Sequence, residues 1–337
     1  MSNHPSRARR RGFLLGIASA GAILLAACSG PAADNPSGGT GAGTPPAPPP
    51  SGGPLTVAVV THGGAGDAFW SVVKNGAEAA GKQLGVTVTY SSDGDPGAQA
   101  RLIDNAVAQK VGGLVVSMAN PDALKTSIEN AVRAGIPVIT INSGSARSKE
   151  LGALAHVGQE EDIAGQQAGE KLKAAGKTRL LCVIHEAGNV GLTQRCQGAT
   201  RGFGAVQNLQ VDLANPTDVE SRIKAALQAD PSIDAVLALN PQVGVLASSA
   251  AKGAGSKAQV ATFDLNADVA TAIKNGDVLF AVDQQQYEQG YLPIVMLKLF
   301  HDNANTLGGG SPVLTGPGFV DKSNVDKVAE YAKRGTR

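Results

Sequence analysis

The stretch Gly113–Asn142, GLVVSMANPDALKTSIENAVRAGIPVITIN, decides the fold class. It opens with the apolar run GLVVSM and closes with the run IPVITI, and both are short and rich in β-branched residues, as strands are. Between them, Leu124, Ile128 and Val132 recur at helical spacing. Because both runs are apolar throughout, they suit parallel strands covered by helices on both faces. The stretch therefore predicts a strand–helix–strand unit of parallel sheet.

The same alternation of strand and helix runs along most of the chain. Upstream lie the strand-like runs LTVAVV and VTVTY, each followed by an amphipathic helical pattern, the first of which begins at the N-cap Asp67 and ends at Gly85. Downstream the pattern restarts at RLLCVIH, continues through AVLALN and QVATFD, and ends with VLFAVD and a helix over Tyr287–Phe300. The sequence therefore predicts an α/β fold of two similar, doubly wound parallel-sheet lobes.

Residues 1–28 read as an export signal. Arg7 and Arg9–Arg11 precede the apolar run Phe13–Ala27, which is too short to be a comfortable membrane span. The run RRGFL resembles a twin-arginine signal, and LAAC resembles a lipobox whose cysteine is Cys28. We therefore expect an extracytoplasmic lipoprotein, anchored through lipid on Cys28 to the outer face of the cytoplasmic membrane. A plain secretory signal with a chance cysteine and a single transmembrane anchor are the alternatives.

Residues 29–54 consist almost entirely of Gly, Pro, Ala, Ser and Thr. Such a composition buries too little apolar surface to offset the entropy of ordering it, so it predicts a disordered tether. Over the whole chain, 29 Lys and Arg residues nearly cancel 28 Asp and Glu residues, and no basic stripe stands out. The charge pattern therefore gives no indication of a nucleic-acid partner. Residues 55–337 are long enough for two domains of ordinary size.

Lipid on Cys28 would leave Cys182 and Cys196 as the remaining cysteines of the chain. In an oxidising compartment unpaired thiols are the less usual state, so a disulfide between them is our expectation. Two buried thiols that never meet are the alternative, because sequence spacing alone does not exclude them.

Polar side chains follow the predicted strands at the points where the strands end. Ligands of open parallel sheets bind beyond the carboxyl ends of the strands, so these side chains are candidates for one site. Carboxylates and amides bond hydroxyls, and aromatic faces cover C–H surfaces, so the set describes a pocket for a neutral ligand with many hydroxyls. The alternative for each Asn or Asp is an ordinary turn or cap. The candidates are His62, Asp67, Asn120, Asn142, Ser143, Glu186, Asn240, Asp264, Asp283 and Gln284, with the aromatic pair Phe69 and Trp70 beside them.

The part of the chain from Leu55 to Arg337 resembles the periplasmic sugar-binding proteins of ABC importers, of the ribose-binding type. The order and spacing of DAFW, AGIPVITIN, QRCQGA, AVLALN, VATFDLN and DQQQYEQG carry the resemblance. It implies that Phe69 and Trp70 clamp the ligand ring and that Arg195, which opens the first helix of the second half, contacts the ligand. The strand-end positions that match the family's pocket are Glu186, Asn240, Asp264 and Gln284.

One position departs from the family's pattern. Where such proteins commonly have Asp-Arg after the VIT strand, this chain has Asn142-Ser143, which lacks both a bidentate acceptor and a cation. A polyol, a cyclitol or an unusual sugar is therefore an alternative to an aldose, with Asp67 and Glu186 supplying the missing acceptors.

The resemblance also implies the type I periplasmic binding protein fold, in which two lobes joined by a three-crossover hinge close around the ligand. By homologous position the crossovers fall near Gly158, Gln284 and Leu314. The N-terminal lobe would then hold residues 55–157 and 285–313, and the C-terminal lobe residues 158–284 and 314–337. The implied partners are a sugar, alditol or cyclitol, an ABC permease and its ATPase, and we expect a monomer with no cofactor and no metal.

Other classes of protein fit the sequence less well. A transcriptional repressor with this core carries DNA-binding helices where this chain has its signal and tether. The chain shows no Gly-x-Ser-x-Gly elbow, zinc-spaced His/Cys cluster or phosphate loop, and His185-Glu186 reads as pocket lining. We therefore predict a binding protein and not an enzyme. A lipoprotein that signals to a membrane receptor and a binder of another small molecule, such as a nucleoside, remain as alternatives.

Overall fold

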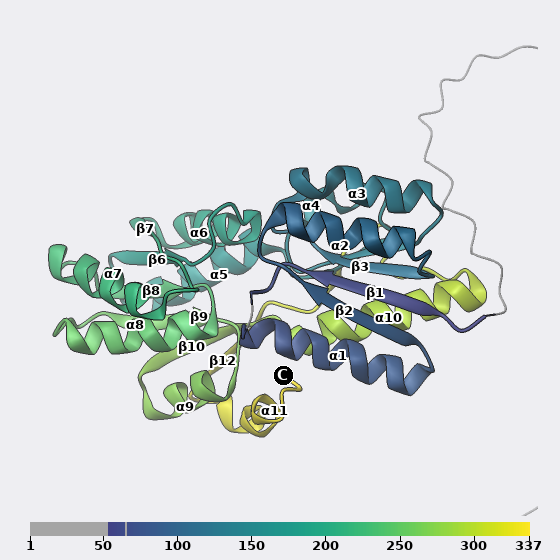
Figure 1. Ribbon diagram of the computed structural model, residues 1–337. Coiled ribbons are helices and arrows are strands. Elements are labelled where there is room, and N and C mark those ends of the chain that lie inside the picture. Colours follow the sequence, from purple (N-terminus) through teal and green to yellow (C-terminus); the bar gives the residue numbers. More distant parts are fainter. Residues whose placement is uncertain (1–52, 65) are drawn as a thin grey trace, which may run out of the picture. The chain divides into compact units, whose positions relative to one another are not determined.

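The computed structural model describes residues 53–64 and 66–337 (Figure 1). The predicted export signal, the lipidation site Cys28 and nearly all of the tether lie outside the described residues. Within the described ranges, no helix is both long enough and apolar enough to cross a membrane.

The N-terminal lobe is built on a six-stranded sheet of order β11-β5-β4-β3-β1-β2, in which all neighbours are parallel. Its strands are β1 (Thr56–Thr61), β2 (Thr87–Ser92), β3 (Gly113–Ser117), β4 (Val138–Ile141), β5 (Ala155–Gly158) and β11 (Val313–Leu314). Its helices are α1 (Ala68–Leu84), α2 (Pro96–Ala108), α3 (Pro121–Arg133), α4 (Ser145–Ser148) and α10 (Gln286–Asn303).

Helices cover both faces of this sheet (Figure 1). On β1, Val57 and Val59 pack in a hydrophobic cluster with α1 and α10, whereas Ala58 and Val60 pack in a second cluster with α2 and α3. Burial on both faces explains why these strands are apolar throughout, and it confirms the predicted parallel sheet.

The C-terminal lobe is built on a second six-stranded sheet, of order β12-β10-β9-β8-β6-β7. Its strands are β6 (Leu180–Ile184), β7 (Val206–Gln210), β8 (Ala235–Ala238), β9 (Gln259–Phe263), β10 (Val278–Asp283) and β12 (Gly318–Asp321). Its helices are α5 (Glu161–Ala174), α6 (Val190–Phe203), α7 (Pro216–Ala229), α8 (Pro241–Gly253), α9 (Ala267–Asn275), the 3₁₀ helix η1 (Val325–Lys327) and α11 (Ala329–Lys333). The edge strand β12 runs antiparallel to β10, whereas all other neighbours in this sheet are parallel.

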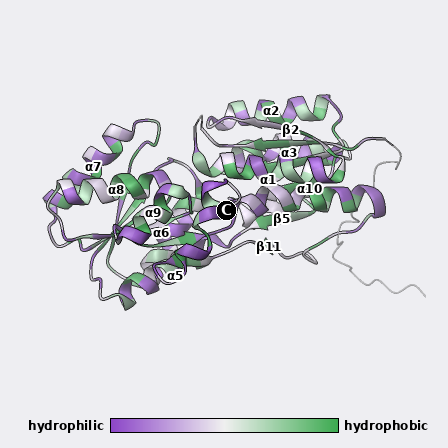
Figure 2. Cartoon of the chain, turned by 90° about the horizontal axis from the view of Figure 1, so that it is seen from below, coloured by the Kyte–Doolittle hydropathy of each residue, from purple (hydrophilic) through white to green (hydrophobic). Residues whose placement is uncertain are grey.

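Apolar and polar residues alternate along the helices of this lobe, as Figure 2 shows for α7 and α8. The pattern follows from packing one helix face on the sheet and leaving the other in water. On α7, for example, Val219, Ile223 and Leu227 are the buried residues, and they join the hydrophobic cluster of the C-terminal lobe.

Glycines allow α5 and α6 to approach closely. A Cβ added at Gly165 would lie 2.0 Å from the carbonyl oxygen of Arg195, and one at Gly198 would lie 2.0 Å from that of Asp162. Side chains larger than hydrogen at these positions would push the helices apart. The close packing fixes the position of Arg195 relative to the first turn of α5.

The chain passes between the two sheets three times. It leaves the first sheet after β5, returns after β10, and crosses a last time between β11 and β12. The crossovers therefore lie between Gly158 and Glu161, between Asp283 and Gln286, and between Leu314 and Gly318. Each lobe is thus made from discontinuous sequence, and the two lobes confirm the predicted fold class.

A disulfide joins Cys182 of β6 to Cys196 of α6. The S–S distance is 2.00 Å, and both residues are buried in the hydrophobic cluster between the sheet and the helix pair α5–α6. The bridge ties the strand that opens the C-terminal lobe to the helix that carries Arg195.

Candidate functional site

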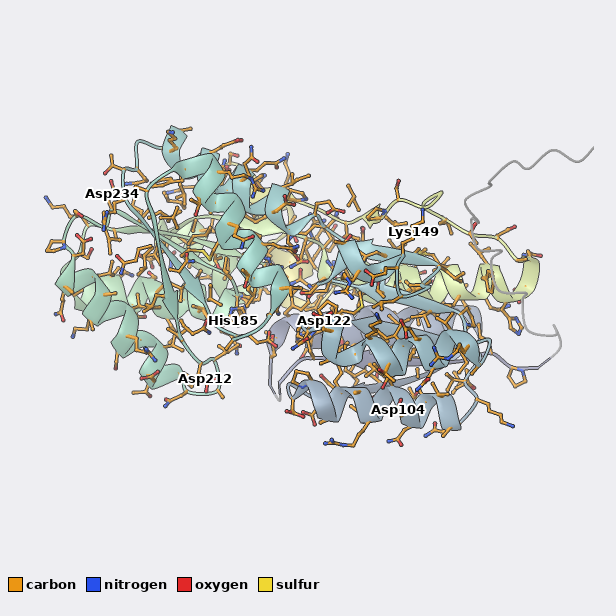
Figure 3. The ribbon with its side chains drawn as sticks, turned by 90° about the horizontal axis from the view of Figure 1, so that it is seen from above. Asp104, Asp122, Lys149, His185, Asp212 and Asp234 are labelled. Atoms are coloured by element: carbon orange, nitrogen blue, oxygen red, sulfur yellow. A yellow bond between two sulfur atoms is a disulfide. The ribbon has the colours of Figure 1, made fainter. Side chains whose placement is uncertain are left out.

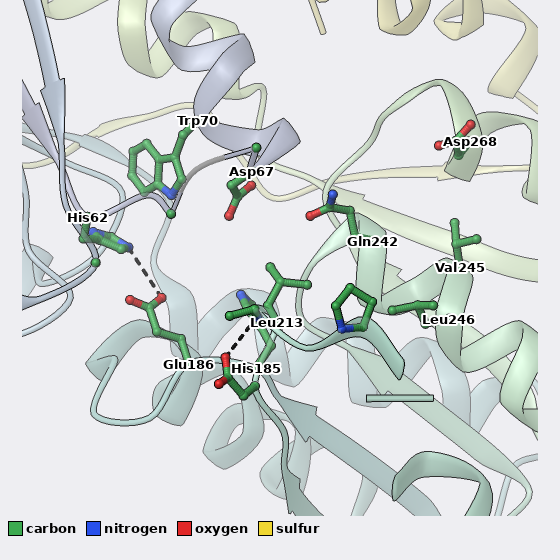
Figure 4. A pocket seen from close by; sticks show the side chains of 16 residues that line it. His62, Asp67, Trp70, His185, Glu186, Leu213, Gln242, Val245, Leu246 and Asp268 are labelled. Atoms are coloured by element: carbon green, nitrogen blue, oxygen red, sulfur yellow. Dashed lines mark hydrogen bonds and ion pairs between the residues drawn. The ribbon is translucent and has the colours of Figure 1, made fainter. Parts of the chain in front are cut away.

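Two neighbouring cavities lie beyond the carboxyl ends of the strands. We call the smaller one, of about 30 Å³, the inner pocket, and the larger one, of about 760 Å³, the outer cavity. The inner pocket is lined by His62, Asp67, Phe69, Trp70, Asn142, Ser143, His185, Glu186, Asn189, Leu192, Arg195, Leu239, Asn240, Asp264 and Gln284. The outer cavity shares five of these residues and adds Gly64, Gly66, Gly94, Asp212, Leu213, Ala214, Pro216, Gln242, Val245, Leu246 and Asp268 (Figure 4).

The structure brings most of the predicted site residues together around the inner pocket, and two of them lie elsewhere. Asn120 caps α3, because its Oδ1 accepts a hydrogen bond from Ala123 N at 3.1 Å. Asp283 is fully buried, and its Oδ2 accepts from Arg337 Nε at 2.7 Å. Neither residue lines the inner pocket or the outer cavity, so both assignments to the pocket need correction.

The aromatic pair lies where the first strand meets the first helix. The ring of Trp70 is edge-on to His62 at 4.6 Å and to Phe69 at 4.9 Å between centroids. A Cβ at Gly63 would lie 2.2 Å from Trp70 Cδ1, so glycine is required beside the indole. Trp70 is only 7% exposed and belongs to the cluster that α1 forms with α10. The indole therefore packs in the hydrophobic core and also forms part of the pocket wall.

Asp67 has the capping role that the sequence predicted and also lines both cavities. Its Oδ1 accepts from Phe69 N at 2.9 Å. Burial raises the pKa of Asp67 to about 6, and the negative charge of Glu186 adds to the rise while the hydrogen bond from Phe69 N opposes it. Among the described residues no cation pairs with this carboxylate, so it remains an acceptor for a ligand.

A buried ion pair lies beside the inner pocket, and one of its members, Arg195, lines the pocket. Arg195 Nε lies 2.6 Å from Glu161 Oε2, and Arg195 Nη2 lies 2.9 Å from Glu161 Oε1, a bidentate arrangement. The guanidinium also stacks over the Phe263 ring at 4.4 Å. Burial disfavours the cation, but Glu161 outweighs it and the pKa of Arg195 rises. Sequence reasoning missed Glu161, because an acidic residue in the first turn of a helix is ordinary.

Asp264 is the second carboxylate near Arg195, at 3.8 Å from Nη1. Burial raises the pKa of Asp264 to about 7, against the opposing effects of Arg195 and of the hydrogen bond from Gln284. The charge of Arg195 is thus neutralised mainly by Glu161, which leaves Asp264 able to accept a hydrogen bond from a ligand.

Gln284, at the second crossover, links the two lobes. Its Oε1 accepts from Asn142 Nδ2 at 3.3 Å, and its Nε2 donates to Asp264 Oδ1 at 2.6 Å. Gln289 Nε2 donates to the same Oε1 at 2.7 Å and so fixes the orientation of the amide. Asn142 follows β4 and Asp264 follows β9, and both have positive φ, 63° and 69°. The two lobes therefore present equivalent strand-end residues to one shared glutamine.

Asn189, another residue that sequence reasoning missed, connects the lobes on the other side of the pocket. Its Oδ1 caps α6 and accepts from Ser143 Oγ at 3.2 Å, and its Nδ2 donates to Glu186 Oε2 at 2.9 Å. The same Nδ2 lies 3.4 Å from His62 Nε2. Burial lowers the pKa of His62, so the ring is neutral and can accept from this amide. A backbone hydrogen bond from Val190 N to Ala119 O, at 3.0 Å, joins the lobes beside it.

His185 lines both cavities but is poorly suited to acid–base chemistry at neutral pH. Burial lowers its pKa to about 3, with further lowering by Arg195, and its Nδ1 has no hydrogen-bond partner among the described residues. The described part of the chain also holds no group of three or more His, Cys, Asp and Glu residues arranged for a metal ion. The arrangement offers acceptors, donors and aromatic faces to a bound molecule.

Comparison with known proteins places the chain in a family. Residues 57–302 match the family model of the periplasmic binding protein domain. A ribose import binding protein from Haemophilus influenzae is 24% identical over 67% of this chain and 79% of its own length, and one from Bacillus subtilis is 26% identical over 64% and 72%. A carbohydrate transporter from Acidothermus cellulolyticus, solved in complex with myo-inositol, is 45% identical over 85% of this chain and all of its own, with a TM-score of 0.83. The chain belongs to the periplasmic binding protein family, as its resemblance to the ribose-binding type predicted.

Proposed function

We propose that this chain is the solute-binding subunit of an ABC importer, and that it captures a neutral cyclitol or related polyol between its lobes. The observation that supports this most directly is the ring of acceptors and donors in the inner pocket, contributed by both lobes around the Phe69–Trp70 pair. Similarity to the transporter solved with myo-inositol favours the same ligand class. The closed complex would then deliver its ligand to a membrane permease and its ATPase.

The chemistry of the pocket favours hydroxyl groups over anions. Asp67, Glu186 and Asp264 supply carboxylates, and the one pocket cation, Arg195, is held by Glu161. Carboxylates accept from hydroxyls, whereas a phosphate or carboxylate ligand would meet like charge. A neutral ligand with many hydroxyls therefore fits best.

The Asn142-Ser143 pair favours a polyol over an aldose. Ser143 Oγ lies 3.0 Å from Asn142 Oδ1, so the pair forms a neutral local contact where proteins of the ribose-binding type commonly have Asp-Arg. Recognition of ligand hydroxyls is then left to Asp67 and Glu186 at one end of the pocket and to Asp264 at the other.

Hinge closure follows from the way in which the lobes share the site. A ligand between them contacts both lobes only when they are together, which gives it the differential affinity that shifts the equilibrium towards the closed form. Gln284 lies at a crossover and bonds a residue of each lobe, so ligand contacts at Asn142 and Asp264 act directly on the hinge.

A thermal-shift screen tests the ligand class. The chain from Leu55 onward would be heated with myo-inositol and other cyclitols, alditols, pentoses, hexoses, nucleosides and amino acids. A ligand at 100 times its dissociation constant stabilises the native state by about 2.7 kcal/mol. We expect the largest shift with a cyclitol, and its loss in Asp264→Asn. Stabilisation by nucleosides or amino acids alone would overturn the proposal.

The proposal also includes attachment to the outer face of the cytoplasmic membrane through lipid on Cys28. In cells, Cys28→Ser should release the protein from the membrane fraction into the medium, and copurification of a permease with the unaltered, ligand-loaded protein tests the partner. Copurification of a membrane receptor instead would favour a signalling role.

A further inference from the structure

The outer cavity is larger than the proposed ligand needs. Its volume, about 760 Å³, lies in the upper part of the range of roughly 300–1,000 Å³ that is typical of pockets for drug-sized ligands. It adjoins the inner pocket, because His62, Trp70 and Glu186 are among the residues that line both. The inner pocket, at about 30 Å³, is smaller than a polyol ring, so a ring bound there would extend into the outer cavity beside Trp70 and Glu186 and leave the rest of it open to anything attached to that ring.

The cavity exists although the two lobes are in contact. Val190 N donates to Ala119 O at 3.0 Å, and Ser143 Oγ donates to Asn189 Oδ1 at 3.2 Å, so the lobes meet at the side of the pocket formed by α6. The outer cavity lies instead towards α7, α8 and α9, which contribute Pro216, Val245 and Asp268 to its lining. It is therefore more than the gap between two separated lobes.

The two walls of the cavity differ in a way that suits a second ring. Leu213, Val245 and Leu246 of the C-terminal lobe are half-buried apolar side chains that pack on the core and face the cavity (Figure 4). On the N-terminal lobe, Gly64 and Gly66 contribute backbone to the wall beside His62, Asp67 and Trp70, and a Cβ at either glycine would meet nothing within 4 Å. The apolar side chains of one lobe and the indole of the other make a slot that can cover the C–H face of a ring.

The charge around the cavity is negative. Asp67, Glu186, Asp212 and Asp268 are among its lining residues, and no Lys or Arg is. Figure 3 marks Asp212 and His185 on the same lobe. Burial lowers the pKa of both lining histidines, so they add no positive charge at neutral pH. A phosphate or carboxylate on the second unit would be repelled.

From these observations we infer that the natural ligand is a conjugate: a polyol ring bound by the residues of the inner pocket carries, through a glycosidic bond, a second ring that lies in the outer cavity, and this second ring is not anionic. The inference rests on the proposed function, since it assigns only the part of the ligand that extends beyond the polyol ring.

Calorimetry on the full chain, purified in detergent, tests the inference. The probes are myo-inositol, its monoglucosides with the second ring at each ring position in turn, and myo-inositol monophosphates. We expect at least one monoglucoside to bind at least as tightly as myo-inositol. Every monophosphate should bind at least about tenfold more weakly than myo-inositol, because like charges at a binding site repel each other. If myo-inositol binds and no monoglucoside does, the inference is wrong. If monophosphates bind as well as myo-inositol, the exclusion of anions is wrong.

A matched pair of variants locates the second ring. Val245→Trp on α8 fills part of the outer cavity. It should lower the affinity for the tightest-binding monoglucoside by about tenfold or more, which is the scale of an overpacked contact, and should change the affinity for myo-inositol by less than about threefold. Ser249→Trp, on an exposed position of the same helix that lines neither cavity, should change neither affinity. Equal loss for both ligands in Val245→Trp would place the second ring elsewhere. If neither myo-inositol nor any monoglucoside binds the unaltered chain, the proposed function itself fails and the inference falls with it.

Discussion

The ion pair between Arg195 and Glu161 should be a main determinant of stability, although Glu161 lines neither cavity. The two side chains are 3% and 2% exposed and share two hydrogen bonds, of 2.6 and 2.9 Å. The substitution Glu161→Gln keeps the size of the side chain and one acceptor oxygen but removes the negative charge. The buried guanidinium would then keep only Asp264, at 3.8 Å, as a carboxylate partner.

The expected cost follows from this burial. Removing one partner of a buried ion pair costs about 3–5 kcal/mol, because it leaves an uncompensated charge away from water. Gln retains one hydrogen bond, so we expect a value near the lower end, about 3 kcal/mol. The neighbouring pair Arg201–Asp162 bridges the same two helices at 2.8 Å but is 48% and 46% exposed, so Asp162→Asn should cost less than about 1 kcal/mol.

Urea unfolding of both variants measures the difference. Glu161→Gln should lower the midpoint with an unchanged m-value, and Asp162→Asn should leave it almost unaltered. Ligand affinity should also fall in Glu161→Gln, because Arg195 loses the partner that orients it. Equal, small costs for the two variants would refute the reasoning, since they would mean that the Arg195–Glu161 pair is solvated like the exposed one.

Three further outcomes follow from the structure. Trp70→Ala should weaken ligand binding by about 1–4 kcal/mol through loss of an anchoring aromatic, and its burial predicts a stability cost of about 3–5 kcal/mol as well; titration of the folded variant that gives unchanged affinity would contradict the pocket assignment. Burial raises the pKa of Asp67 to about 6, so the acceptor carboxylate is ionised mainly above that value, and affinity measured by calorimetry should fall from pH 7 to pH 5. Asp67→Asn should reduce this fall, and the part that remains belongs to Asp264, whose pKa burial raises to about 7. An identical profile would exclude Asp67 as a titrating group. Replacing both Cys182 and Cys196 by Ala opens a bridge that spans 14 residues and should cost about 2–4 kcal/mol in urea unfolding, whereas two free thiols in the denatured, unreduced protein would show that the bridge is absent.

Most of the strands that the sequence revealed are buried on both faces, although the run VTVTY, which became the half-exposed edge strand β2, was also predicted from its β-branched residues. The runs that became β1, β3, β4, β6 and β8 are apolar and bounded by turns, so their type was predictable. Strand β7, VQNLQ, escaped because it is a half-exposed edge with a polar composition. The antiparallel β12 escaped for another reason: its direction depends on the last crossover, which no local pattern encodes.

The candidate site was predictable where a residue follows a strand. Asn142, Asp264 and Gln284 could be assigned to the pocket because parallel strands bring their carboxyl ends to one edge. Glu161 and Asn189 could not, because each reads locally as an ordinary residue at a helix start, and only the packing of α5 against α6 and of one lobe against the other gives it a partner. Trp70 shows the same limit, since the sequence predicted its place beside the ligand but not the contacts with Gly63 and His62 that help to bury it.

The positive φ angles at Asn142 and Asp264 restrict how this family of pockets can change during evolution or in the laboratory. At φ values of 63° and 69°, most side chains are strained, and Asn, Asp and Gly are the residues that tolerate the conformation. A library that randomises these two positions would mostly sample misfolded or destabilised proteins, whatever ligand it is selected for. New specificities are therefore more accessible by varying Ser143, Glu186 and Val245, whose φ angles are not positive, while the two strand-end positions are limited to exchanges among Asn, Asp and Gly.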